Sequence, residues 1–265
     1  MGALIKGLLL AMGVTLGSLP QEAPEPVASP VVAMELLVEP LEIQAGMFFD
    51  GASFRVSALV PEGLGITVSC VGGKEPVVLN RKGRALGIIW MNLGEVEIDG
   101  APDLYLLHAS GDLGEVATSA SLTESGVGYA AVEGRATMTG AEGEEDRFFD
   151  EFVRLKESDG LFLISEEAME EVPGPEGLVR VSVEFRLPAK TPPGDYQILV
   201  HGFGGEGGVL LGTTTLRVTQ VGMAAFIRDL AIEHGLVYGI MAVVVAIAVG
   251  LFTGVIFGLG SKKAH

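Results

Sequence analysis

The strongest constraint on this chain is an uncharged stretch near its C-terminus, from Gly235 to Gly260. A helix over 236–259 would have 24 residues and a length of about 36 Å, enough to cross a bilayer core of about 30 Å with some tilt. Apolar residues make up 48% of the chain and charged residues only 19%, which is too apolar for an ordinary soluble domain. We therefore predict one transmembrane helix over 236–259.

The charges around this span predict its orientation. Lys262 and Lys263 follow it, and positive charges beside a span favour the cytoplasmic side. The tail 260–265 is then cytoplasmic, and everything before the span lies outside. We expect 220–235 to form a juxtamembrane amphipathic helix that rests in the headgroup region and leads continuously into the span. Its apolar face would consist of Met223, Phe226, Ile227 and Leu230.

The N-terminus also predicts export. Residues 1–6 carry one positive charge, and 8–19 are apolar but short for a span, as in a secretory signal peptide. A strip rich in proline, glutamate and alanine follows, so we assign 1–33 to a signal peptide and linker. Cleavage after Gly17 and cleavage after Ala33 both remain open, and so does an uncleaved N-terminal anchor.

Residues 34–219 are predicted to form the exported domain, which is mainly β. Short apolar runs alternate with turns at the spacing of an antiparallel sandwich. Tyr196 follows a Pro-Pro-Gly-Asp turn and enters the next strand, which resembles the last strands of immunoglobulin-like domains, where a tyrosine braces the sandwich corner. We therefore predict an immunoglobulin-like antiparallel sandwich. Its expected strands are 35–43, 52–60, 65–71, 76–79, 85–91, 104–109, 178–187, 196–203 and 209–218.

The middle of this domain is acidic. Residues 112–176 hold 17 acidic and four basic residues, a net charge of −13 out of −17 for the whole chain. Within them, 144–158 has the spacing of an amphipathic helix. Its expected apolar face consists of Phe148, Phe149, Phe152, Val153 and Leu155. We predict a partly helical insertion over 112–176 in one sandwich, with two separate β-domains as the alternative.

Several stretches resemble one protein family. They are VLNRKGRALGIIWMN at 78–92, FVRLK at 152–156 with GL at 160–161, FRLP at 185–188 with PGDY at 193–196, and HGLVYG at 234–239. On them the chain is similar to a family of bacterial transmembrane proteins of alphaproteobacterial type. The resemblance implies a signal peptide, a periplasmic β-rich domain and one C-terminal inner-membrane helix, without an established activity. It also implies a partner, because such proteins are often encoded beside a membrane permease of the sulfite or sulfonate exporter type.

A basic cluster stands out in the acidic exterior. Arg81, Lys82 and Arg84 are the closest-spaced basic residues of the predicted exported domain. Guanidinium and ammonium groups on one turn suit a small oxyanion or an acidic partner surface. The alternative is a solvated hairpin turn whose charges keep a sheet edge from pairing with other chains. The two interpretations are compatible.

Small residues recur at every fourth position of the predicted span. They are Ala242, Ala246, Gly250, Gly254 and Gly258. Such a stripe permits close approach of another helix, in a second copy or in an integral membrane partner. A fortuitous stripe is the alternative, because small residues are common in membrane helices.

Other functional classes find little support in the sequence. The net charge of −17 argues against non-specific nucleic-acid binding, which depends on basic groups that neutralise phosphates. The four histidines are far apart, no nucleophile elbow or phosphate loop is present, and we expect no metal, cofactor or catalytic residues. Asp99, Asp103, Asp112 and Glu115 match no calcium-loop template. Cys70 alternates with Ile66 and Val68, which predicts a buried strand thiol.

These observations predict a non-enzymatic, single-pass protein of the bacterial inner membrane. Its N-terminal domain would be periplasmic and its C-terminus cytoplasmic. We expect it to be an accessory or interaction subunit of a membrane partner such as a sulfite/sulfonate-type permease, or a homodimer through the span. The alternative is a periplasmic ligand-binding or sensing module in which Arg81, Lys82 and Arg84 hold a small oxyanion.

Overall fold

The computed structural model describes residues 35–85, 89–205 and 207–260, and for 81–85, 89–93, 223–225 and 256–260 it describes the backbone alone. The predicted signal peptide and linker over 1–33 and the lysines at the C-terminus lie outside these ranges. By residue, strands account for 43% of the structure and helices for 28%. The prediction of a mainly β protein with one C-terminal apolar helix is therefore confirmed.

Strand β3 (Gly51–Pro61) illustrates how the sheets form. Phe54, Val56, Ala58 and Val60 are buried, whereas the residues between them are more exposed. This alternation presents one apolar face, as expected for a strand with one side on a core. It belongs to a four-stranded antiparallel sheet in the order β1-β3-β11-β10. The other strands are β1 (Leu36–Glu39), β10 (Glu170–Pro173) and β11 (Leu178–Pro188).

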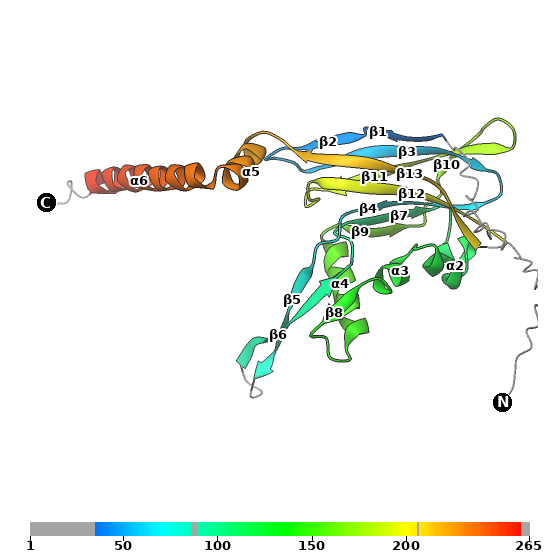
Figure 1. Ribbon diagram of the computed structural model, residues 1–265, viewed down its shortest axis with the longest axis horizontal. Coiled ribbons are helices and arrows are strands. Elements are labelled where there is room, and N and C mark those ends of the chain that lie inside the picture. The colour runs from blue at the N-terminus through cyan, green and yellow to red at the C-terminus, as the bar shows by residue number, and fades with distance from the viewer. Residues whose placement is uncertain (1–34, 86–88, 206, 261–265) are drawn as a thin grey trace, which may run out of the picture. The chain divides into compact units, whose positions relative to one another are not determined.

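A six-stranded sheet has the order β2-β13-β12-β4-β7-β9 (Figure 1). Its strands are β2 (Glu42–Ala45), β4 (Gly65–Val71), β7 (Tyr105–Ala109), β9 (Phe162–Ser165), β12 (Gly194–Gly204) and β13 (Gly207–Gln220). The inner pairs are antiparallel, as predicted, but the two edge strands, β2 and β9, pair in parallel with β13 and β7. The predicted strand over 35–43 is thus two strands, β1 and β2, in different sheets.

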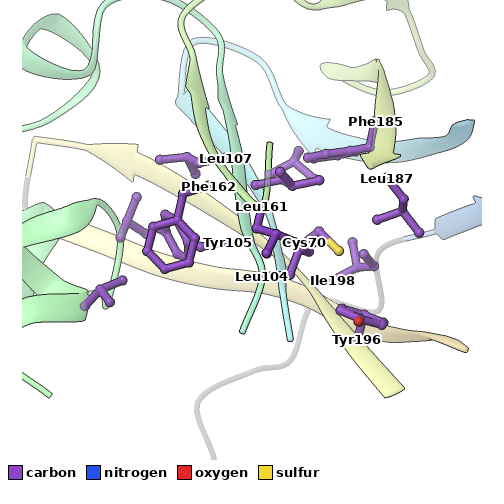
Figure 2. Packing of buried hydrophobic residues seen from close by; sticks show 14 of the residues in the cluster. Cys70, Leu104, Tyr105, Leu107, Leu161, Phe162, Phe185, Leu187, Tyr196 and Ile198 are labelled. Carbon is purple, nitrogen blue, oxygen red and sulfur yellow. The ribbon is translucent and has the colours of Figure 1, made fainter. Parts of the chain in front are cut away.

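The two sheets share one hydrophobic core. His108 on β7 meets Phe185 on β11 edge to face, with ring centroids 4.8 Å apart, and Phe185 stacks on Phe54 of β3 at 5.1 Å. Cys70 is fully buried and belongs to this core together with Ile198 (Figure 2). The predicted buried thiol is confirmed, and burial raises its pKa above the ordinary value.

The acidic segment supplies helices as well as two of these edge strands. The helices are α1 (Leu113–Val116), α2 (Ser119–Glu124), α3 (Tyr129–Glu133) and α4 (Glu145–Ser158). Phe152 on α4 packs against Phe162 on β9 at 5.5 Å, and Tyr129 stacks on Phe162 at 5.9 Å. Helices α3 and α4 therefore cover β9 through an aromatic cluster. Leu155, expected on the apolar face of α4, is exposed instead, because it lies one turn beyond the buried phenylalanines toward the C-terminus of the helix.

The segment 112–176 is therefore more than an insertion, since β9 and β10 complete the edges of the two large sheets. A third sheet departs from the expected sandwich as well. It has the order β5-β6-β8, with β5 (Val77–Ala85), β6 (Ile89–Asp99) and β8 (Thr137–Thr139). Val96 and Ile98 of β6 are buried in the core. The described residues of the predicted strands 76–79 and 85–91 belong to this sheet, because β5 and β6 pair with each other.

Two helices follow the last strand. Gly222 links β13 to α5 (Met223–Glu233). Its φ of 74° is a backbone conformation that favours glycine. His234 has φ and ψ of −129° and 49°, outside the helical region, and α6 (Gly235–Gly260) begins at the next residue. The expected continuous helix is therefore wrong: the α5 hydrogen bonds end at His234 and those of α6 start there.

Candidate functional site: a groove along the apolar C-terminal helix

Helix α6 is long and apolar enough to cross a membrane. The qualifying stretch is Gly235–Val255, with 21 residues and a mean hydropathy of 2.5, and its most apolar window is 0% buried within the chain. Valine, isoleucine, leucine and phenylalanine side chains thus project from a helix that the described domain does not cover. In water such a surface would be strongly unfavourable, so its natural environment is lipid or another apolar helix.

A groove of about 670 Å³ runs along one side of α6. It is lined by Ile227, Tyr238, Met241, Ala242, Val245, Ala246, Val249 and Gly250. Ile227 comes from α5, so both helices contribute. The α6 members recur at intervals of three and four residues, which places them on one face of a helix. This lining carries no charge and can offer only packing contacts and the Tyr238 hydroxyl.

The groove contains part of the predicted small-residue stripe. Ala242, Ala246 and Gly250 form part of its lining, whereas Gly254 does not. Four residues turn a helix by about 400°, which is one full turn plus about 40°. The stripe therefore winds around α6 by about 40° at each step, and over the four steps from Ala242 to Gly258 it turns by about 160°. A partner that crosses α6 at an angle follows such a row, as in right-handed crossings of small-residue motifs.

The glycines of this stripe are open to an incoming side chain. A Cβ atom built on Gly250 or Gly254 meets no atom of the chain within 4 Å. Nothing in this chain therefore requires glycine at these positions, and an added side chain would project into the surroundings. Sequence reasoning found the small residues but missed Tyr238, Met241, Val245 and Val249. Their spacing with the alanines would have revealed the same face.

The basic cluster lies on strand β5. Arg81, Lys82 and Arg84 pair with Gly94, Asn92 and Trp90 of β6, and the register shifts between Arg81 and Lys82. The side chains of the three basic residues lie outside the described part. They are strand residues within a paired hairpin, whereas the sequence suggested a turn. The oxyanion interpretation stays a prediction.

Two of the acidic residues that match no calcium-loop template have separate local roles. Asp99 accepts a hydrogen bond from the amide of Gly100 at 2.7 Å, and Asp112 caps α1 through the amide of Gly114 at 2.7 Å. In the described ranges, no three His, Cys, Asp or Glu side chains gather as metal ligands would. His201 is buried on β12, and His265 lies outside the described residues.

Asp103 is the acidic side chain most affected by its surroundings. A Cβ on Gly72 would lie 1.8 Å from Asp103 Oδ1, so the carboxyl packs directly over a glycine. Burial raises the pKa of Asp103, while the nearby charge of Lys156 opposes this. Lys156 Nζ donates to the Asp103 carbonyl oxygen at 3.1 Å and thereby ties α4 to the segment before β7. No described pocket opens onto this pair, and we interpret it as structural.

Comparison with known proteins gives a family. The family model described as "Putative transmembrane protein (Alph_Pro_TM)" matches residues 34–258. The match begins after the predicted linker and extends through nearly all of α6, so it covers the sandwich, the acidic segment and both C-terminal helices. No curated protein and no solved structure matches the chain.

Proposed function

Because the chain belongs to the Alph_Pro_TM family of transmembrane proteins, we propose that it is a non-enzymatic, single-pass protein of the bacterial inner membrane. In this proposal the sandwich lies in the periplasm and the C-terminus in the cytoplasm. Helix α6 both anchors the chain and packs, through its groove, against an integral membrane partner.

The groove on α6 is the observation that supports the partner. Lipid chains adapt to any apolar surface and need no row of small residues, whereas a packed helix gains contacts where the backbone is accessible. Ala242, Ala246 and Gly250 provide such access within the groove. We propose a polytopic partner, such as a permease of the sulfite/sulfonate type that the family resemblance implies. A second copy of this chain is the other occupant that the experiment distinguishes.

We interpret the sandwich as immunoglobulin-like, a fold often used for interaction. The first strand segments divide between the sheets: β1 pairs with β3, and β2 pairs with β13. In the second sheet, β12, β4 and β7 lie beside β13 in that order. This order resembles the two sheets of immunoglobulin domains, with extra strands beside the second sheet. The Tyr196 hydroxyl donates to the carbonyl oxygen of Pro192, as in a tyrosine corner. The fold itself carries no activity.

Co-purification from native membranes tests the partner. The tagged full-length protein and its Gly250→Leu/Gly254→Leu variant are extracted in mild detergent, and co-purifying proteins are identified by mass spectrometry. Ala248→Leu is the matched control. It lies two residues, or about 200°, from Gly250 and does not line the groove.

We expect an integral membrane protein to accompany the wild-type protein and the Ala248→Leu control. The double variant should lose it because two leucines would separate the helix backbones. Equal recovery with all three proteins would contradict the groove as the interface. Recovery of a tagged and an untagged copy together, lost in the double variant, would assign the groove to a homodimer.

A further inference from the structure

One loop of the sandwich exposes large apolar side chains. It connects β2 to β3 over 46–50, and the amide of Phe49 donates to the carbonyl oxygen of Gly46 at 3.1 Å to form a tight turn. Phe49 packs against the core, whereas Met47 is 63% exposed and Phe48 is 88% exposed. Two neighbouring apolar side chains at a loop tip are costly in water, so a surface that covers them is expected.

The position of this loop identifies that surface. Strand β2 runs parallel to β13, with Ala45 opposite Gln220, so both strands end at the same end of the sheet. The amide of Val221 donates to the carbonyl oxygen of Ala45 at 3.0 Å. Gly222 then opens α5. The apolar loop therefore begins at the point where the chain leaves the sandwich for the membrane-spanning helix.

The connecting helix, α5, is short enough to keep this end of the sheet near the bilayer. Helix α5 has 11 residues, or about 16 Å at 1.5 Å per residue, and α6 begins two residues later. Phe226, Ile227 and Ile232 on α5 are exposed, so this helix presents apolar side chains that suit the membrane interface. If α5 lies in the interface, the end of β13 and the loop beside it are brought to the headgroup layer, which adds about 5 to 7 Å on each side of the hydrocarbon core.

A cationic side chain lies near the apolar side chains of the loop and of α5 at this end of the sheet. Arg228 of α5 lines a pocket of about 410 Å³ together with Arg217 and the end of β13. Arg217 is neutralised by Asp195, with Nε to Oδ1 at 2.8 Å. The Arg228 guanidinium forms an exposed ion pair with Asp229, with Nε to Oδ1 at 3.8 Å, which is too long for a hydrogen bond. A guanidinium in such a position suits a phospholipid phosphate.

We propose that the loop 46–50 inserts Met47 and Phe48 into the outer headgroup region of the bilayer that α6 spans, as a second membrane contact that fixes the orientation of the sandwich. The proposal rests on membrane insertion of α6, which the proposed function includes, and not on the partner. The occupant to which we commit is the phospholipid surface.

Tryptophan quenching by brominated phospholipid tests the proposal in the full-length protein reconstituted into liposomes. Trp90 is first replaced by phenylalanine, and Phe48→Trp is introduced as the reporter. Val209→Trp is the matched control, because Val209 is 62% exposed but lies 11 residues before Gln220 on β13, about 36 Å away along the strand. Flotation of the liposomes shows separately whether α6 has inserted.

The Phe48→Trp protein should lose emission when the bromine lies near the headgroup end of the acyl chain, and the Val209→Trp control should keep it. Equal emission of the Phe48→Trp protein in brominated and ordinary lipid, with the protein still floating, would overturn the loop contact and leave the span intact. A blue-shifted but unquenched emission would also overturn it, because protein would then cover Phe48. Failure to float would instead contradict the membrane insertion on which the proposed function depends.

Discussion

The sandwich and helix α6 use the same apolar side chains in opposite ways. Phe152 on α4 is 0% exposed and contacts Phe162, whereas Phe252 on α6 is 69% exposed. The sandwich satisfies its apolar surface within the chain, and α6 leaves its own for the surroundings. The difference indicates that apolar side chains stabilise the fold of the domain, whereas our proposal assigns those of the span to anchoring and assembly.

The same contrast extends to polar groups. Two regions of the sandwich surface have pockets lined by ion pairs, one with Arg217 and Asp195 and one with Arg55 and Glu184. The groove on α6 has no charged lining residue. A ligand at either of these two pockets would need to compete with an ion pair, whereas the partner helix that we propose for the groove would displace only lipid.

Truncation of matched phenylalanines should give the largest difference between the two regions. Phe152→Ala is expected to lower the free energy of unfolding by about 3 to 5 kcal/mol, because it leaves a cavity in a closed aromatic cluster. Phe252→Ala should leave unfolding of the domain unchanged. Urea unfolding of the detergent-solubilised protein, followed by circular dichroism of the strands, measures both. Equal losses of unfolding free energy in the two variants would contradict this difference between the sandwich and α6.

Loss of a single hydroxyl should give a smaller difference. Tyr196→Phe removes the hydrogen bond to the Pro192 carbonyl oxygen and is expected to cost about 1 kcal/mol of unfolding free energy. Tyr238→Phe on α6 is the control, since Tyr238 lies in the span, outside the domain whose unfolding is followed. If Tyr196→Phe unfolds like the wild-type protein, the tyrosine does not brace this corner.

The smallest effect should be a pH dependence confined to the sandwich. Burial lowers the pKa of His201 and of His108, so the folded domain binds these protons less tightly than the unfolded chain, in which histidine titrates near about 6.5. The domain is then most stable above that pH and loses stability as the pH falls through it. The urea midpoint should decrease from pH 7.5 to pH 5.5.

A His108→Asn/His201→Asn variant should reduce this decrease, and an unchanged pH response would exclude these histidines as its source. The span contributes nothing to the effect, because no charged residue lies within 235–260.

Much of the sandwich could be predicted from the sequence because local patterns determine it. The alternation in β3, β4 and β11 and the turn before Tyr196 each indicate a strand within a few residues. The edges could not be predicted in this way. Strand β10 has four exposed residues, two of them glutamates, so only pairing with β11 reveals it. The short β9 lies in acidic sequence whose composition suggested an insertion.

The candidate site was predictable in part. The small residues of α6 could be read directly, but their rotation around the helix decides which of them share the groove. Ile227 could not be assigned to the groove from the span residues alone, because it lies on α5, before the break at His234. The position of the loop at Phe48 beside the start of α5 could not be predicted, because it follows from the parallel pairing of β2 with β13, a contact distant in sequence.

Photo-cross-linking in the native membrane tests the central claim most directly. A photo-reactive amino acid is placed at Ala246, inside the groove, or at Ala248, about 200° around the helix. Our account predicts a cross-linked product with an integral membrane protein from Ala246 and little or none from Ala248. Equal products from both positions, or products from Ala248 alone, would contradict the assignment of the groove as the surface through which this protein meets its partner.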